Sequence, residues 1–156
     1  MTTTPSIQNR KARFRFFIYE KFEAGIAFLG CEVKSIREGR VNLSDSFVRV
    51  MKREAFLFNC HITPYSKIQG HTGIDAVRIR KLLLNRAELD TLEGKMSQKG
   101  FSIVPLSMFF KKGKVKVEIA LAKGKKQHDK REEIKRRIHD RESSAAVKQH
   151  QRKQRS

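Results

Sequence analysis

Alternating hydrophobicity between residues 114 and 121 constrains the fold of this chain more than any other feature. The apolar positions of this segment are Val115, Val117, Ile119 and Leu121. Because successive side chains of a strand point to opposite faces, a period of two predicts a β-strand with one buried face. Residues 104–110 alternate in the same way, and the intervening Lys111-Lys112-Gly113 predicts a hairpin turn.

Four further segments have the apolar and β-branched character of short strands. They span residues 14–19, 23–29, 47–51 and 55–62. Short strands joined by hairpin-length connections predict a closed or nearly closed antiparallel barrel. Pro105 has no N–H for a strand ladder, so we expect its strand to lie at a sheet edge or to carry a bulge.

Two helices are predicted between these strands. The longer one begins at Asn85, because an Asn followed three residues later by Glu88 is typical of a capping box, and it ends at Gly100. The shorter one spans residues 32–37. Residues 67–77 contain two glycines and are predicted to form a surface loop. The body is therefore predicted to be mainly β, with two or three accessory helices.

Charge divides the chain into two parts. Its 156 residues suit one domain, and 35 Lys and Arg against 16 Asp and Glu give a net charge of +19. This excess indicates a polyanionic partner, either a nucleic acid or an anionic membrane surface. Residues 123–156 hold 13 basic and five acidic residues and almost no large apolar ones. The sequence therefore predicts a folded body up to residue 122 and a basic tail that is disordered when free.

The tail nevertheless has local signals for a helix. Asp129 is a suitable N-cap with Glu132 three residues on, and Glu133 lies one helical turn before Arg137. Glu132 and Arg136 form a second pair of this kind. Two isoleucines, Ile134 and Ile138, are too few to dock the segment on the body. We therefore expect a helix that becomes ordered only against a partner.

Several function classes lack their sequence signature. No apolar run approaches the roughly 20 residues that span a bilayer, and the start of the chain has no secretory signal. Cys31 and Cys60 are predicted to be reduced thiols in a cytoplasmic protein, with Cys60 buried and inert. His61 and His71 match no metal-site spacing. We expect no catalytic residue, no metal and no cofactor, so the protein is not predicted to be an enzyme.

Basic residues interleaved with aromatic ones indicate contact with a nucleic acid. Arg13 and Arg15 alternate with Phe14 and Phe16, and we expect the rings to fill the barrel while the guanidinium groups contact phosphate. A second basic cluster consists of Lys123, Lys125 and Lys126. It lacks a Walker pattern but suits a flexible segment that clamps phosphates. These residues alone do not distinguish RNA from DNA.

Seven segments in order resemble the SmpB (small protein B) family of bacterial tmRNA-binding proteins. They are Asn9-Arg10-Lys11-Ala12, Phe22-Glu23-Ala24-Gly25, Gly30-Cys31-Glu32-Val33-Lys34-Ser35, Asn42-Leu43-Ser44-Asp45-Ser46, His61-Ile62-Thr63-Pro64-Tyr65, Arg80-Lys81-Leu82-Leu83-Leu84, and Ala122 to Arg131. Together they cover about residues 9–131 without a large gap. A single segment carries little weight, whereas the ordered set is specific to that family.

The resemblance implies an oligonucleotide-binding (OB)-like barrel over residues 9–122, after a flexible N-terminus at residues 1–8. The barrel would bind the tRNA-like domain of tmRNA and help to place alanyl-tmRNA, carried by elongation factor Tu, in the A site of a stalled ribosome. The tail, residues 123–156, would enter the empty mRNA channel of the small subunit and fold into a helix there. This function in trans-translation and ribosome rescue implies a cytoplasmic protein, and we expect a monomer.

The resemblance also implies roles for individual residues. By position, the RNA-contacting residues would be Asn9, Glu23, Leu83 and Lys116. His128 would stack in the decoding centre beside Asp129, Lys130 and Arg131, and the following helix would present Ile134, Arg136, Arg137 and Ile138 to the ribosome. The chain departs from the family at Phe14-Arg15-Phe16, where the family usually has His, an acidic residue and Tyr, and in the small residues 143–147 of its tail.

Two other interpretations are compatible with the composition. A general RNA chaperone would use the tail only to neutralise phosphate and would bind many RNAs equally. A protein of the membrane surface would bind anionic vesicles. Selective retention of one structured RNA from a bacterial lysate would separate the SmpB interpretation from both.

Overall fold

The computed structural model describes residues 6–64 and 74–155, and most of the predicted loop at 67–77 lies outside these ranges. The chain forms two compact units, a body from Met1 to Gly124 and a tail from Lys125 to Ser156. The division falls two residues beyond the predicted one, because the last strand of the body continues to Gly124.

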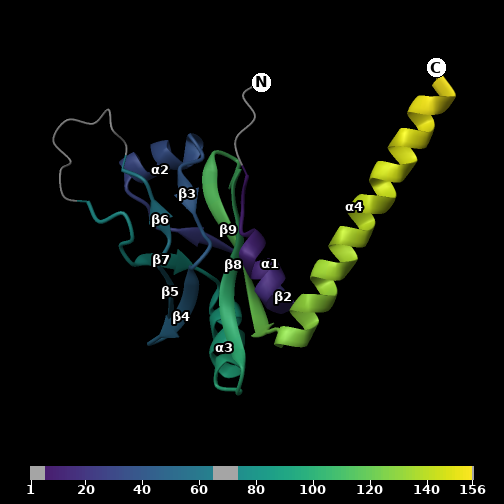
Figure 1. The fold of residues 1–156 in the computed structure, drawn as a ribbon. Helices are drawn as coiled ribbons and strands as arrows, with labels where there is room; N and C mark the ends of the chain where they lie inside the picture. Colours follow the sequence, from purple (N-terminus) through teal and green to yellow (C-terminus); the bar gives the residue numbers. More distant parts are fainter. Residues whose placement is uncertain (1–5, 65–73, 156) are drawn as a thin grey trace. The chain divides into compact units, whose positions relative to one another are not determined.

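Over its described residues, the body is mainly antiparallel β-structure with three helices (Figure 1). Its strands are β1 (Ile7–Gln8), β2 (Phe16–Ile26), β3 (Val41–Asn42), β4 (Phe47–Met51), β5 (Glu54–Phe58), β6 (His61–Ile62), β7 (Arg80–Leu83), β8 (Phe101–Lys111) and β9 (Lys114–Gly124). Its helices are α1 (Arg10–Arg15), α2 (Gly30–Arg37) and α3 (Arg86–Met96). The main sheet has the order β1-β8-β4-β5-β7-β2-β9, and an additional β8–β9 pairing closes six of these strands into a ring.

The long hairpin of β8 and β9 confirms the alternation found in the sequence. Lys111 pairs with Lys114, and the two residues between them, Lys112 and Gly113, have positive φ angles of 50° and 76°. Positive φ at both positions is the signature of the two-residue turn that matches strand twist. The register shifts between Pro105 and Ser107, so β8 carries the predicted bulge at its proline.

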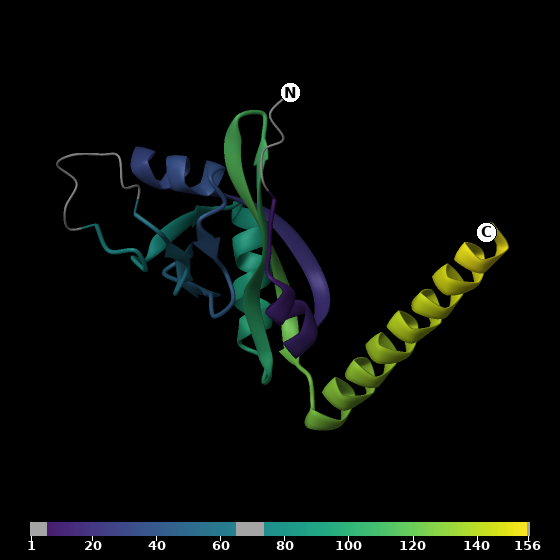
Figure 2. The same cartoon turned by 45° about the horizontal axis from the view of Figure 1, so that its top comes forward.

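The core lies on the inner face of this hairpin. The four apolar positions of β9 named above are at most 7% exposed and pack in one cluster with Ile36 of α2 and Leu92 of α3. A smaller cluster on the other face of β8 and β9 contains Ala12 of α1 together with Ala120 and Ala122. Figures 1 and 2 accordingly show α1 and α3 on opposite sides of β8.

Several boundaries differ from the predicted ones. Phe14 and Arg15 belong to α1 rather than to a strand, because Asn9 caps this helix and its buried Ala12 packs on β8 and β9. The predicted strands 14–19 and 23–29 are one strand, β2, with a bulge at Tyr19. The predicted strand 55–62 divides into β5 and β6, because Asn59 has a φ of 57°. The helix predicted from Asn85 ends at Met96, before Gly100.

The tail unit is one helix, α4 (Gln127–Arg155). This differs from the disordered segment predicted for the free tail, and the helix begins two residues before the predicted cap, Asp129. Local interactions account for its helical form: Glu133 accepts from Arg137 at 2.5 Å, as predicted, and Glu132 pairs with His128 at 3.4 Å rather than with Arg136. Its large apolar side chains remain exposed, at 45% for Ile134 and 50% for Ile138.

Candidate nucleic-acid interface

Three strands of the body place an apolar and a cationic side chain on either side of a glycine. Gly25 of β2 lies opposite Lys116 of β9 on one side and opposite Leu83 of β7 on the other. Residues directly opposite one another in antiparallel strands share a face, so the three form one row across the sheet, which we call the Lys116–Gly25–Leu83 row. Leu83 is 55% exposed, and Lys116 is half-buried.

The missing side chain of Gly25 opens a groove along this row. The groove has a volume of about 390 Å³, and Val33 of α2 and Phe28 add to its lining. A Cβ atom at position 25 would lie 3.3 Å from the Cβ of Leu83, which is closer than ordinary contact. The glycine therefore leaves backbone accessible between a hydrophobic surface and an ammonium group, which suits the approach of a base and a phosphate.

The next row of the same face carries two carboxylates. Glu23 of β2 lies directly opposite Glu118 of β9, which is unfavourable for like charges. Surrounding cations offset this repulsion: Lys111 contacts both oxygens of Glu23 at 3.2 Å, and Lys21 lies 3.6 Å from Glu118. Arg13 lies 3.9 Å from Glu118. The face therefore keeps a positive balance while offering carboxylate oxygens as acceptors.

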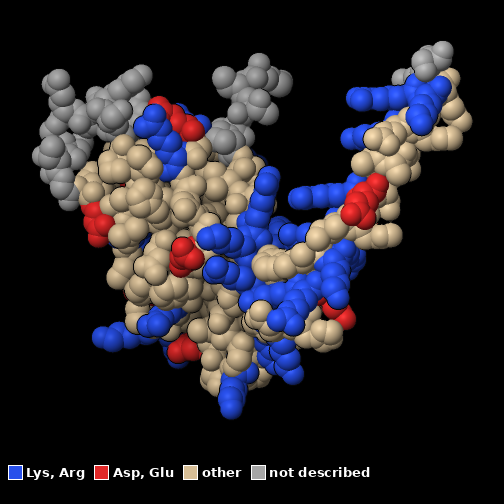
Figure 3. All heavy atoms as spheres, in the orientation of Figure 1, with Lys and Arg blue, Asp and Glu red and all other residues tan. Residues whose placement is uncertain are grey.

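A second groove, of about 330 Å³, lies at these carboxylates and is lined partly by Phe109. Phe109 pairs with Lys116 across β8 and β9, so its half-buried ring belongs to the same face. The sequence analysis did not single out this residue. Its position in the β8 alternation, out of phase with the buried Met108, is the signal that could have identified it. Figure 3 shows Lys and Arg side chains gathered around β8, β9 and α1.

Asn9 does not lie on this surface. It is 2% exposed, its side-chain oxygen accepts from the Ala12 N–H at 3.1 Å, and its amide nitrogen donates to the carbonyls of Leu43 and Pro105 at 2.9 and 2.8 Å. Both polar groups of its side chain are therefore used inside the protein. In the structure Asn9 therefore holds α1 in place, and the RNA contact that the resemblance implied for it stays a prediction.

Arg13 and Arg15, in contrast, are exposed on the last turn of the helix that Asn9 caps. Arg15 lies 3.7 Å from Asp45. The guanidinium groups are therefore at the surface, where phosphate contact was predicted, and the rings of Phe14 and Phe16 are half-buried, with Phe16 against the small cluster beneath α1.

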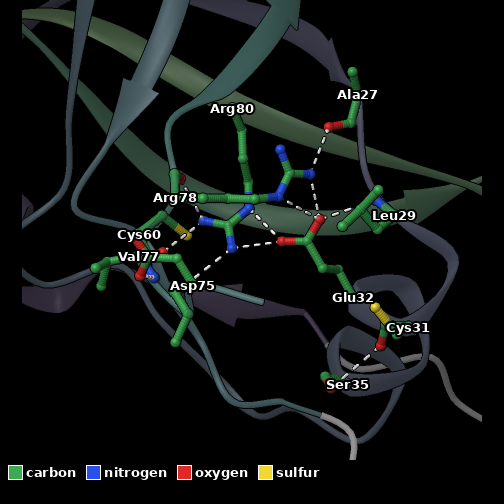
Figure 4. Close-up of polar contacts among 11 residues, drawn as sticks. Ala27, Leu29, Cys31, Glu32, Ser35, Cys60, Asp75, Val77, Arg78 and Arg80 are labelled. Atoms are coloured by element: carbon green, nitrogen blue, oxygen red, sulfur yellow. Dashed lines mark hydrogen bonds and ion pairs between the residues drawn. The ribbon is translucent and has the colours of Figure 1, made fainter. Parts of the chain in front are cut away.

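A buried ion network connects α2 with β7 and the residues before it (Figure 4). Glu32 of α2 is 4% exposed and accepts from Arg80 at 2.6 Å, from Arg78 at 3.1 Å through Nε, and from the Leu29 N–H at 2.9 Å. The fully buried Arg80 also donates to the carbonyls of Cys60 and Ala76. This network ties α2, which supplies Val33, to the segment leading into β7, which supplies Leu83.

The network also controls the ionisation of Glu32. Burial alone would raise the pKa of this carboxyl, but the hydrogen bonds from Arg78, the Leu29 amide and Arg80 outweigh that effect and lower it. Glu32 is therefore ionised at neutral pH, and the buried Arg80 has a charged partner.

Lys123 lies at the far end of β9 from Lys116. Its ammonium nitrogen is 4.5 Å from the ring centre of Phe101 and 5.9 Å from that of Tyr19. The other two lysines of its basic cluster belong to the tail unit. There Lys125 pairs with Glu133 and lowers the pKa of that carboxyl, and Lys126 is exposed.

The residues predicted to contact the ribosome all lie on α4. Six of them are exposed, namely His128, Arg131, Ile134, Arg136, Arg137 and Ile138, and two, Asp129 and Lys130, are half-buried. Ile134 and Ile138 are four residues apart and therefore share one face of the helix. The helix thus presents basic and apolar side chains together.

The two cysteines differ in environment. Cys60 is fully buried, and burial raises the pKa of its thiol to about 11, so it is protonated at neutral pH. Cys31 is half-buried in α2.

His61 is exposed, and His71 lies outside the described residues. Within residues 6–64 and 74–155, no group of three His, Cys, Asp or Glu side chains could hold a metal ion. None of the helices described in these ranges is both long and apolar enough to cross a membrane.

Comparison with known proteins places the chain in a family. The family model described as "SmpB protein" matches residues 6–149. The SsrA-binding protein of Wolinella succinogenes is 54% identical over 143 residues, which cover 91% of this chain and 95% of that relative. The SsrA-binding protein of Trichodesmium erythraeum is 51% identical over 142 residues and covers 91% of each chain.

A solved structure agrees with these relatives. Its chain, described as "tmRNA-SmpB: a journey to the center of the bacterial ribosome", superposes with a TM-score of 0.67 at 43% identity and covers 83% of this chain and 94% of that one. The family model, the relatives and the solved structure therefore all indicate the same family. The chain belongs to the SmpB protein family.

Proposed function

We propose that this chain is a tmRNA-binding protein of trans-translation. Its body binds the tRNA-like domain of tmRNA and, with elongation factor Tu, helps to deliver alanyl-tmRNA to the A site of a stalled ribosome. Membership of the SmpB family and the SsrA-binding name of its relatives support this function. The single structural observation that carries it is the Lys116–Gly25–Leu83 row on the outer face of the sheet.

The chemistry of this row suits a folded RNA. Leu83 offers an exposed apolar surface for an unstacked base, and Lys116 offers a cation for a neighbouring phosphate. Glu23, in the adjoining row, accepts hydrogen bonds from base amino groups. A carboxylate on a face with a positive balance disfavours contact with phosphate alone, so Glu23 contributes selectivity rather than affinity.

The N-terminal helix adds a second contact to the same RNA. Asn9 holds α1 against the sheet through its three internal hydrogen bonds. Arg13 and Arg15 on the last turn of that helix then contact phosphates, because their guanidinium groups lie at the surface. In this account Asn9 acts through the placement of α1.

We assign a separate role to the end of β9 and the basic tail that follows it. Lys123 of β9 and the tail residues Lys125 and Lys126 contact RNA phosphates, and α4 enters the empty mRNA channel. His128, Asp129, Lys130 and Arg131 contact the decoding centre. The exposed Ile134 and Ile138 pack against the channel, together with Arg136 and Arg137. An isolated helix with so few apolar residues has little to stabilise it, so contact with the ribosome would stabilise the helical form of the tail.

The closed ring of paired strands supports the assignment of an OB-like barrel to residues 9–122, preceded by a flexible N-terminus at residues 1–8 and followed by the tail. We infer that the protein acts in the cytoplasm as a monomer that binds one RNA. A strongly basic body with a folded recognition surface needs no second copy to complete the row described above.

Selective capture of RNA tests this function. The full chain is immobilised, exposed to a bacterial lysate, and the retained RNA is sequenced. We expect strong enrichment of tmRNA by the natural protein and loss of this enrichment in the triple variant Glu23→Ala, Leu83→Ala, Lys116→Ala. Equal retention of many RNAs, or binding to anionic vesicles without selective retention, would instead favour the general chaperone or the membrane-surface protein.

A further inference from the structure

A second row of aromatic and cationic side chains crosses the sheet at its opposite end. Lys123 of β9 lies opposite Phe101 of β8 on one side and opposite Phe17 of β2 on the other. Direct partners share a face, so the lysine lies between two rings. Phe101 packs partly on the core, whereas Phe17 is 45% exposed.

The bulge in β2 adds a third ring to this row. Ile18 pairs with Ala122 and Glu20 with Leu121, so Tyr19 is the extra residue between them. A bulge redirects the side chain that it carries. The Tyr19 ring meets the Phe101 ring edge to face, with centres 5.3 Å apart and planes at 75°, and still leaves 59% of the residue exposed. A core side chain thus holds an accessible ring in a fixed orientation.

The lysine in this cluster keeps its charge available to a ligand. Its ammonium group faces the rings of Phe101 and Tyr19, and within the described ranges it forms no ion pair with a carboxylate. Lys123 and Lys116 lie seven residues apart on β9, which corresponds to about 23 Å of strand, and an odd separation places them on opposite faces. The cluster is therefore distinct from the Lys116–Gly25–Leu83 row.

We propose that Tyr19, Phe101 and Lys123 form a second binding site, which takes one unpaired nucleotide of single-stranded RNA. The base stacks on the exposed Tyr19 ring, and the adjacent phosphate contacts Lys123. Duplex RNA has its bases already stacked and leaves the ring unused, and an apolar protein surface would bury the Lys123 charge without a partner. This inference rests on the proposed function of the chain as an RNA-binding protein, but its test does not require tmRNA.

Intrinsic fluorescence offers a direct test. The chain has two Tyr and no Trp, so Tyr65→Phe leaves Tyr19 as its single tyrosine. The probe is a short, unstructured oligouridylate, titrated into the full-length Tyr65→Phe protein. We expect stacking to quench Tyr19 fluorescence in a saturable way, and a duplex RNA with the same number of phosphates to leave it unchanged. Absence of saturable quenching, or equal quenching by the duplex, would overturn the site.

Affinity variants provide an independent measurement. Tyr19→Ala should weaken oligouridylate binding at least about fivefold, while Tyr19→Phe keeps the ring and binds normally. Lys123→Gln should weaken binding and lower the salt slope by about 0.7, the share of one single-strand phosphate contact. Ile79→Ala, which removes an exposed apolar side chain outside the cluster, serves as the control and should bind normally.

The outcomes separate this site from the proposed function. If Tyr19→Ala binds oligouridylate as tightly as the natural chain, or if it loses self-association or vesicle binding instead, the inference is wrong. The function fails separately, if the natural protein does not select tmRNA in the capture experiment. Oligouridylate quenching with no tmRNA selection would therefore uphold the site and reject the function.

Discussion

Lys116 and Leu83 lie on the two strands that flank β2 and are separated across the sheet only by Gly25. Because the glycine has no side chain, the groove between them reaches the backbone. The proposed RNA recognition depends on this absence as much as on the two side chains themselves.

Gly25→Ala should therefore weaken tmRNA binding while the protein stays folded. The added methyl group would lie 3.3 Å from the Leu83 Cβ and would raise the floor of the groove, so we expect a loss of about tenfold in affinity, or about 1.4 kcal/mol. Gly94→Ala in α3 is the matched control, because a Cβ there meets nothing within 4 Å. That change should stabilise the protein by about 0.5–1 kcal/mol and leave binding unchanged. Unchanged binding by Gly25→Ala would remove the groove from the interface.

Charge and shape at the same row can be separated by salt dependence. Lys116→Ala should weaken tmRNA binding and lower the slope of log affinity against log salt by about one, since one counterion-releasing contact is lost. Leu83→Ala and Glu23→Ala should weaken binding at an unchanged or slightly changed slope. Filter binding of tmRNA at several salt concentrations measures both quantities, with Lys95→Ala in α3 as the control for loss of charge. If all three variants bind normally, the RNA face lies elsewhere.

The Glu32 network makes a prediction about stability and pH. Glu32→Gln removes the charged partner of the buried Arg80, and breaking such a pair costs about 3–5 kcal/mol at neutral pH. Because the pKa of Glu32 is lowered in the folded protein, its contribution is fully present above the pKa of the unfolded chain and is lost as pH falls through the folded pKa. Denaturant unfolding of both proteins should therefore show a difference that shrinks from about pH 4 downward. A difference that is constant with pH would contradict the ionised state of Glu32.

The cysteines test the assignment as a protein without thiol chemistry. Cys60→Ala and Cys31→Ser should leave tmRNA binding and peptide tagging intact, because the Cys60 thiol is protonated and buried. Cys60→Ala should cost about 1–2 kcal/mol of stability through the small cavity it creates. Loss of tagging by a variant that still unfolds cooperatively would contradict this assignment.

Local patterns predicted the strands better than their ends. The alternation of 114–121 and the Lys112-Gly113 turn are confirmed because both depend on neighbouring residues only. The helix at residues 10–15 was missed because it depends on Asn9, whose amide reaches carbonyls 34 and 96 residues away in sequence. Strand β7 was not among the predicted strands, because its four residues are too few to show an alternation of their own.

In the candidate site, too, features that depend on residues far apart in sequence could not be predicted. Exposed Leu83 and Glu23 were named from the resemblance alone, and no periodicity places them together; the register of β2 with β7 and β9 does so. The buried Glu32–Arg80 pair was missed because charged residues in a sequence suggest solvent exposure. Tyr19 was assigned to an ordinary strand, since a bulge depends on the partner strand and leaves no local signal.

The proposed division of labour between body and tail is tested by the tail variants. A chain ending at Lys126 keeps the compact body unit and should bind tmRNA with a modest loss, since fewer phosphates are contacted. It should fail to add the peptide tag on stalled ribosomes. Scrambling residues 129–144 keeps the charge and should also abolish tagging, because the positions of the isoleucines and of the ion pairs are lost.

The most direct measurement is peptide tagging by full-length Ile134→Pro on ribosomes stalled on an mRNA without a stop codon. Proline inside α4 costs about 3 kcal/mol of helix stability without changing the charge, and Ile134→Ala is the control that removes the side chain but preserves the helix. The account predicts normal tmRNA binding by both variants, loss of tagging by Ile134→Pro, and substantial tagging by Ile134→Ala. Normal tagging by Ile134→Pro would contradict the helical role of the tail and leave only neutralisation of phosphate charge.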